Sequence, residues 1–283
     1  MDSRSILVIA LLWLIVVAVV LLLFVWPRYR RRKLDATPFP HEWLLLLREN
    51  LTIYRGMWPD QQAQLRRLIM RFLADKKFVG CAGQVIDDNV RITIAAHASL
   101  LLLNRPTNEY HDLNYILVYP TDFLVRREER DESGLVSEGA HALSGESWDN
   151  GKVILAWESV VAGIRNFGDG DNVVLHEFAH QLDHESGITN GAPILGQNQS
   201  YDTWSSVLAD EYAALCQACD ENRQTLIDPY GATNPAEFFA VVTETFYERA
   251  HELAHHHPAL FEQLQAYFRV DPREWQPNPY QES

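Results

Sequence analysis

Residues 176–183 have the sequence His-Glu-Phe-Ala-His-Gln-Leu-Asp, an H-E-x-x-H motif that directly follows a Gly-Asp-Gly-Asp-Asn turn at residues 168–172. A turn of this composition before an apolar run predicts the start of a buried helix. Because His176 and His180 are four positions apart, they lie on one face of that helix and can bind one metal ion. Glu177 lies about 100° further round the helix, where its carboxylate can reach a metal-bound water. The motif therefore predicts a hydrolytic metal site, with an accidental match on an ordinary helix as the alternative.

A third ligand must come from elsewhere, because a catalytic zinc usually has three protein ligands and one position open to water. Residues 230–244 predict a turn, an Asn-Pro helix start and an amphipathic helix. This helix offers Glu237 and Glu244, which lie two turns apart on one face. Spacing alone does not choose between them, and either could be an ordinary solvated carboxylate.

Several further stretches combine with the motif to suggest a family. They are Gly-Glu-Ser-Trp at residues 145–148, Val-Ile-Leu-Ala-Trp at 153–157, Pro-Tyr-Gly at 229–231 and Ala-Glu-Phe-Phe-Ala at 236–240. Through these stretches the chain, over about residues 43–271, resembles the Mlc titration factor A family of bacterial zinc peptidases. It is more distantly similar to the catalytic domain of anthrax lethal factor.

The resemblance implies a role for each candidate residue. Zinc is held by His176, His180 and Glu237, and it lowers the pKa of a bound water from about 16 toward 7. Glu177 then acts as general base, and the Tyr230 hydroxyl and zinc stabilise the developing oxyanion. Glu244 supports the ligands from behind or is structural.

Two further features of the site are expectations of the sequence. Asp183 is a candidate to accept a hydrogen bond from a ligating histidine, and an exposed carboxylate near a helix end is an equally good interpretation. Residues 153–157 form a short apolar run that predicts a strand. The resemblance favours a sheet edge that binds an extended peptide substrate as an added strand, with a simple core strand as the alternative.

The N-terminus predicts a transmembrane helix. Residues 6–26 form an uncharged run of 21 residues, long enough to cross a hydrocarbon core of about 30 Å. A secretory signal would carry its positive charge before a shorter apolar stretch. Here the basic residues come afterwards, at Arg28 and residues 30–33, so the large domain is expected in the cytoplasm, anchored in the inner membrane.

Composition favours one substantial globular domain after this anchor, with 47% hydrophobic and 22% charged residues. We expect a helix-rich α+β domain of zincin type at residues 34–272, behind an anchor and basic collar at residues 1–33 and before a flexible tail at 273–283. The net charge of −14 argues against nucleic acid as a direct partner. Three cysteines suggest no disulfide framework and agree with a reducing compartment.

Local patterns predict the remaining elements. The leucine runs at residues 44–47 and 100–103 are too short to span a membrane and are expected in the core, and residues 126–146 are expected to form a loop over the cleft or a solvated connection. Helices are expected at residues 60–74, 91–103, 202–219, 236–250 and 258–268, and a strand at 115–119.

Three functions compete. The first is a membrane-anchored zinc peptidase that acts on peptides or on exposed parts of proteins. The second, implied by the resemblance, is a regulatory binding module that sequesters a transcriptional repressor. The third is an inactive relative with a structural metal. The presence of Glu177 and Tyr230 favours the enzyme, because a protein that only binds needs neither residue.

Overall fold

The structure is a computed structural model that describes residues 3–105, 110–122 and 151–280. The loop expected at residues 126–146 and the stretch at 145–148 lie outside these residues. The chain divides into two compact units, Met1–Pro40 and His41–Ser283. Each unit is described by itself.

The first unit is helical from Ser3 to Ala36. It comprises α1 (Ser3–Val20), a short π-helical segment η1 (Leu21–Val25) and α2 (Trp26–Ala36). The segment Leu11–Ala36 is long and apolar enough to cross a membrane, with a mean hydropathy of 2.5 in its most apolar window and no burial there. This segment overlaps the predicted span at residues 6–26.

The second unit contains a sheet of three parallel strands in the order β1 (Lys77–Gly80), β2 (Tyr115–Tyr119) and β3 (Lys152–Ala156). Ile116 pairs with Phe78 on one side and with Val153 on the other. The strands predicted at residues 115–119 and 153–157 are confirmed by β2 and β3. In the described part of the sheet β3 is an end strand, as the edge hypothesis requires.

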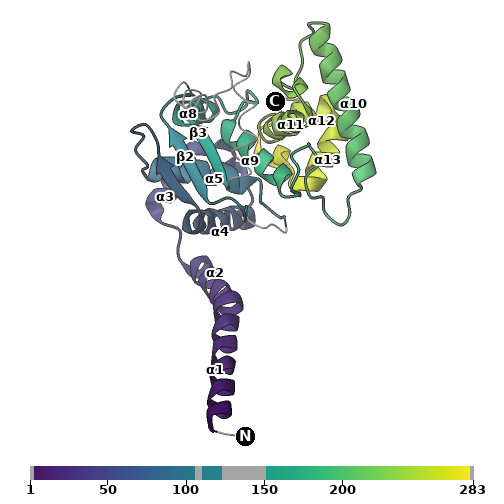
Figure 1. The fold of residues 1–283 in the computed structure, drawn as a ribbon. Coiled ribbons are helices and arrows are strands. Elements are labelled where there is room, and N and C mark those ends of the chain that lie inside the picture. The colour runs from purple at the N-terminus through teal and green to yellow at the C-terminus, as the bar shows by residue number, and fades with distance from the viewer. Residues whose placement is uncertain (1–2, 106–109, 123–150, 281–283) are drawn as a thin grey trace. The chain divides into compact units, whose positions relative to one another are not determined.

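Helices cover this sheet (Figure 1), and α4 and α3 both pack against α5. Residues 100–103 are buried as expected. In the other leucine run, Leu47 is buried but Leu45 is 51% exposed, so the expectation of a core position is wrong for Leu45. The elements of this part are α3 (His41–Asn50), η2 (Thr52–Gly56), α4 (Pro59–Asp75), α5 (Asp88–Leu100) and α8 (Trp157–Arg165).

The C-terminal part is an all-helical layer whose core is aromatic. Trp204, Phe239 and Tyr267 contact one another with ring centroids 5.4–5.9 Å apart. The helix predicted at residues 236–250 ends two residues early. The elements are α10 (Tyr201–Asp220), η3 (Pro229–Ala232), α11 (Pro235–Glu248), α12 (Ala250–His256), α13 (Pro258–Phe268) and η4 (Pro272–Trp275).

The packed part of the chain reaches into the segment that was expected to be a loose tail. Trp275 is buried, and its indole N–H donates to Gln61 over 2.9 Å. Glu274 accepts from the Trp58 indole over 2.8 Å. Two tryptophan hydrogen bonds therefore connect η4 with the N-terminal end of α4.

Helix α9 (Val173–His184) joins the two halves of this unit. It lies between the sheet and the C-terminal helices (Figure 1) and contacts β3, α5 and α11. All residues from Val174 to Asp183 are buried. Since this helix carries the H-E-x-x-H motif, the fold places that motif in the centre of the unit.

Candidate metal centre

The turn at residues 168–172 fixes where α9 begins. Gly168 and Gly170 have φ angles of +114° and +91°, which L-residues with side chains rarely adopt. Asn172 is the N-cap residue, and its side-chain oxygen accepts from the backbone N–H of Leu175 over 3.2 Å. The helix start therefore places His176 one turn after the cap.

Three buried side chains meet on the face of α9 that contacts α11. His176 Nε2 lies 3.0 Å from Glu237 Oε2 and 3.2 Å from His180 Nε2, and the third distance, from His180 Nε2 to Glu237 Oε2, is 3.3 Å. Among the residues that the structure describes, this is the group of histidine, cysteine and carboxylate side chains that could hold a metal ion. The histidines and Glu237 predicted from the sequence thus form a triangle of ligand atoms.

The triangle fits a tetrahedral ion. Ligand atoms about 2.0–2.1 Å from a tetrahedral zinc lie roughly 3.3 Å apart, which is close to all three distances. Two imidazole nitrogens that face each other within 3.2 Å are poor partners without a shared cation or proton. The donor set of two nitrogens and one carboxylate oxygen is also one that zinc accepts.

Glu244 supports His176 from behind. Its Oε1 lies 2.8 Å from His176 Nδ1, and its second oxygen accepts from the backbone N–H of Asn172. A carboxylate at Nδ1 holds a proton on that nitrogen and leaves the Nε2 lone pair for a metal. The supporting role for Glu244 therefore agrees with the geometry.

Asp183 does not take this position, so the prediction that it orients a histidine is wrong. Its Oδ2 accepts from the backbone N–H of Gly191 over 2.6 Å. The side chain is fully buried, which also excludes the alternative of an exposed carboxylate. The positive φ of Gly191 (+78°) turns the loop after α9 back toward the helix, and Asp183 fixes that loop.

The side chains of the site have strongly shifted pKa values. Burial lowers the pKa of His176, but the Glu244 charge and the hydrogen bonds to Glu237 and Glu244 raise it well above its usual value. Burial would raise the pKa of Glu237, yet the hydrogen bonds with His176 and His180 hold that pKa well below its usual range. Glu237 is therefore an ionised carboxylate at neutral pH, as a ligand must be.

Glu177 and Tyr230 lie at the same site. The Tyr230 ring centroid is 5.9 Å from that of His176. Burial, together with the charges of Glu237 and Glu177, raises the pKa of Tyr230. The phenol therefore keeps its proton at neutral pH and can donate a hydrogen bond. The Glu177 charge acts on both Tyr230 and His176, so the predicted base lies within electrostatic reach of the ligands.

Glu248 belongs to the same network, although the sequence did not single it out. It accepts from the backbone N–H groups of Gly168 and Gly170, both over 3.1 Å, and from Asn172 Nδ2 over 3.0 Å. It therefore holds the turn that starts the metal helix. The sequence contains one pattern that could have identified Glu248. Glu237, Glu244 and Glu248 recur on one face of an otherwise apolar helix.

The position of Glu248 predicts a pH-dependent stability. Burial raises its pKa to about 7 from a usual value of 4.5, despite the three N–H donors. The folded chain therefore retains a proton that the unfolded chain has released, so the free energy of unfolding should fall as pH rises through this interval. The loss should reach about 3 kcal/mol, and Glu248→Gln should remove it.

This effect is measured by urea unfolding of the chelator-treated protein at several pH values across that interval. Glu262→Gln, which removes an exposed carboxylate from α13, is the matched control. Its free energy of unfolding should vary with pH as that of the wild type does. Parallel curves for the wild type and Glu248→Gln would contradict the assignment of the slope to Glu248.

Comparison with known proteins agrees with this centre. The family described as glucose-regulated metallo-peptidase M90 matches residues 25–269. An uncharacterised protein of Synechocystis is 43% identical over 248 residues, which cover 87% of this chain and 90% of the relative. Mlc titration factor A of Pectobacterium atrosepticum is 31% identical over 77% of this chain and 84% of its own length. The corresponding values for Mlc titration factor A of Cronobacter sakazakii are 30%, 87% and 92%. The chain therefore belongs to the M90 family of metallopeptidases.

Proposed function

We propose that the chain is a zinc-dependent peptidase of zincin type, in which His176, His180 and Glu237 hold the metal. The observation that carries this proposal is the triangle of three buried ligand atoms, 3.0–3.3 Å apart. Zinc bound there supplies a water of lowered pKa and polarises the peptide carbonyl. Membership of a metallopeptidase family supports this choice.

The chain's own groups then move the protons. Glu177 accepts a proton from the attacking water and delivers it to the leaving amine. The Tyr230 hydroxyl donates a hydrogen bond to the carbonyl oxygen as that oxygen becomes negative. Glu244 keeps His176 in the orientation and tautomer that a ligand requires.

The substrate in this proposal is an extended peptide. β3 pairs with β2 on one side and contacts α9, the metal helix. Within the described sheet its other edge has no neighbouring strand. Such an edge can bind a peptide through main-chain hydrogen bonds, which suits hydrolysis of many sequences.

Glu177→Gln tests the enzyme directly. The variant keeps all three proposed ligands but lacks the base, so hydrolysis should fall by about 10²- to 10⁴-fold with zinc content unchanged. Metal analysis and hydrolysis of a broad peptide set check both values on the wild type and the variant.

Each other outcome has a definite meaning. One zinc without hydrolysis in either protein would favour the regulatory binding module, for which a repressor is the candidate partner. No zinc in either protein would remove the metal assignment. Equal hydrolysis by the variant and the wild type would remove Glu177 as the base.

Tyr230→Phe tests the second catalytic group. Loss of one hydrogen bond to a developing oxyanion typically lowers kcat by about 10²- to 10³-fold. Because the bond strengthens only as charge develops, KM should change little. Tyr212→Phe, on α10, removes a hydroxyl that donates to the Ala232 carbonyl and serves as the control. Equal losses in the two variants would indicate a general packing effect.

We propose further that the apolar helix of the first unit anchors the chain in a membrane, with the second unit in the cytoplasm. Support comes from the helix Leu11–Ala36 and from the basic residues at its C-terminal end. Basic residues beside a span remain on the cytoplasmic side.

A green fluorescent protein fused to the C-terminus of the full-length chain tests this orientation, since it fluoresces when it folds in the cytoplasm. We expect fluorescent protein in the membrane fraction that detergent extracts and alkaline carbonate does not. A shortened chain released from the membrane would instead identify the helix as a cleaved signal sequence.

A further inference from the structure

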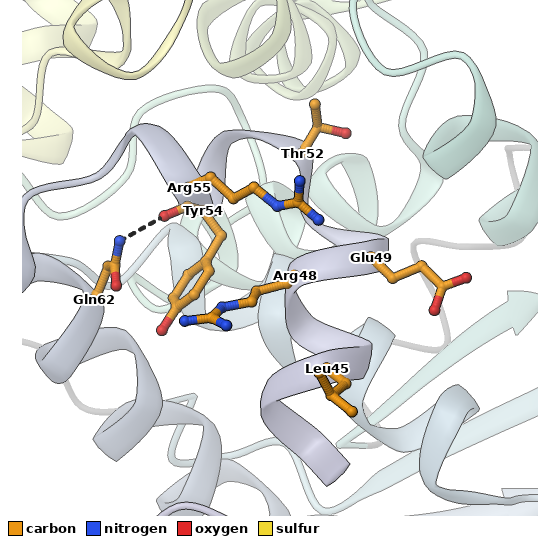
Figure 2. Close-up of a pocket in the computed structure, with 7 residues that line it drawn as sticks. All are labelled: Leu45, Arg48, Glu49, Thr52, Tyr54, Arg55 and Gln62. Carbon is orange, nitrogen blue, oxygen red and sulfur yellow. Dashed lines mark hydrogen bonds between the residues drawn. The ribbon is translucent and has the colours of Figure 1, made fainter. Parts of the chain in front are cut away.

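An open pocket of about 890 Å³ lies in the second unit, where α3, η2 and α4 meet (Figure 2). It does not include any residue of the metal centre. Its wall is held by two hydrogen bonds from Gln62 to the backbone carbonyls of Tyr54 and Met57, both 3.1 Å, and by Arg66, which donates to the Tyr54 hydroxyl over 2.6 Å. The lining residues are Leu45, Arg48, Glu49, Thr52, Tyr54, Arg55 and Gln62.

The pocket presents positive charge. Arg48 and Arg55 both line it. Figure 2 shows the Arg48 guanidinium beside Tyr54 and the Arg55 guanidinium near Thr52, while the Glu49 carboxylate points away from Arg48. Within the part of the chain that the structure describes, neither Arg48 nor Arg55 has an ion-pair or hydrogen-bond partner. Guanidinium groups in this state are suited to bidentate recognition of a phosphate.

The chain itself favours a lipid as the source of that phosphate. Four residues, 37–40, separate the end of α2 from the start of α3, which supplies three of the lining residues. From helix rise and the length of an extended chain, Arg48 lies at most roughly 35 Å from the basic collar at Lys33. A tether of this length keeps the local concentration of membrane headgroups high, so that weak contacts become effective.

The pocket also has the mixed character of a membrane-surface contact. Leu45 is 51% exposed at its edge, beside the charged groups. An apolar side chain next to basic ones suits the boundary between headgroups and acyl chains. The chain beyond residue 33 has a more negative net charge than the whole chain. A pocket lined by two arginines therefore differs in charge from the unit around it.

We propose that this pocket binds the phosphate of an anionic phospholipid headgroup and thereby holds the catalytic unit against the membrane surface. Arg48 and Arg55 bind the phosphate, and Leu45 contacts the adjoining apolar layer. The inference rests on the proposed membrane anchoring but not on the metal chemistry. The negative charge of Glu49 repels the anion, so this residue reduces the positive charge of the pocket.

The test uses the full-length chain in nanodiscs of phosphatidylcholine, with or without an equal share of phosphatidylglycerol that carries a headgroup photo-crosslinker. Cross-links should map to residues 45–62. Arg48→Gln and Arg55→Gln should each lower their yield about fivefold, since one basic group near an anionic surface contributes about that factor. Glu49→Gln should raise the yield. Arg67→Gln, which removes an exposed charge from α4 outside the pocket, is the matched control and should retain the wild-type yield.

Four outcomes overturn the proposal, and each has its own meaning. Equal yields in all variants would mean that headgroups do not use the pocket. Protection of residues 45–62 from hydrogen exchange by inorganic phosphate in neutral nanodiscs, without selective lipid cross-links, would assign the pocket to a soluble anion. Failure of the chain to remain in neutral nanodiscs would overturn the anchoring together with the headgroup site, whereas retention without cross-links would overturn the headgroup site alone.

Discussion

The contact between Glu244 and His176 is the constraint on which the centre depends. The histidines belong to α9 and the carboxylates to α11, so the two helices must pack in one register. A buried imidazole or carboxylate without a partner costs several kcal/mol, and a shift of one turn would separate Glu237 from both histidines and Glu244 from His176. The aromatic layer beneath α11 makes such a shift costly, because close-packed rings have few alternative arrangements.

The same register also determines how α9 begins. Glu244 binds the backbone N–H of Asn172, and Glu248 binds its side chain together with two glycine N–H groups of the turn. One helix therefore supplies a candidate ligand, the support of another ligand and the clamp on the helix start. Because these groups are fixed by packing before any metal binds, little conformational freedom remains to be lost on binding. This arrangement buries three carboxylates, which is unfavourable for their charged forms. The raised pKa of Glu248 reflects this cost.

Local sequence predicted the parts of this arrangement that local rules determine. Residues four apart lie on one face of any helix, as His176 and His180 do, and the short apolar run of β2, closed by Pro120, indicates a strand without tertiary information. The choice of Glu237 over Glu244 came from a family resemblance, since spacing left both open. β1 was missed because it is short and mostly exposed, and Asp183 was misplaced because its partner, Gly191, depends on a loop that returns to the helix.

The two units of the chain differ in charge, since the basic collar belongs to the first unit and most of the acidic residues belong to the second. An acidic domain tethered to an anionic membrane surface is repelled by it on average, yet at physiological ionic strength exposed charges separated by more than about 8 Å are largely screened. The electrostatic interaction with the membrane therefore depends on the charged groups nearest the bilayer and not on the net charge of the domain. A basic collar at the end of the anchor and a pair of unpartnered arginines in the next helix and turn give local attraction without changing the sign of the whole domain. If the first unit anchors the chain as proposed, this division lets the second unit keep its acidic net charge while the segment next to the anchor favours the membrane.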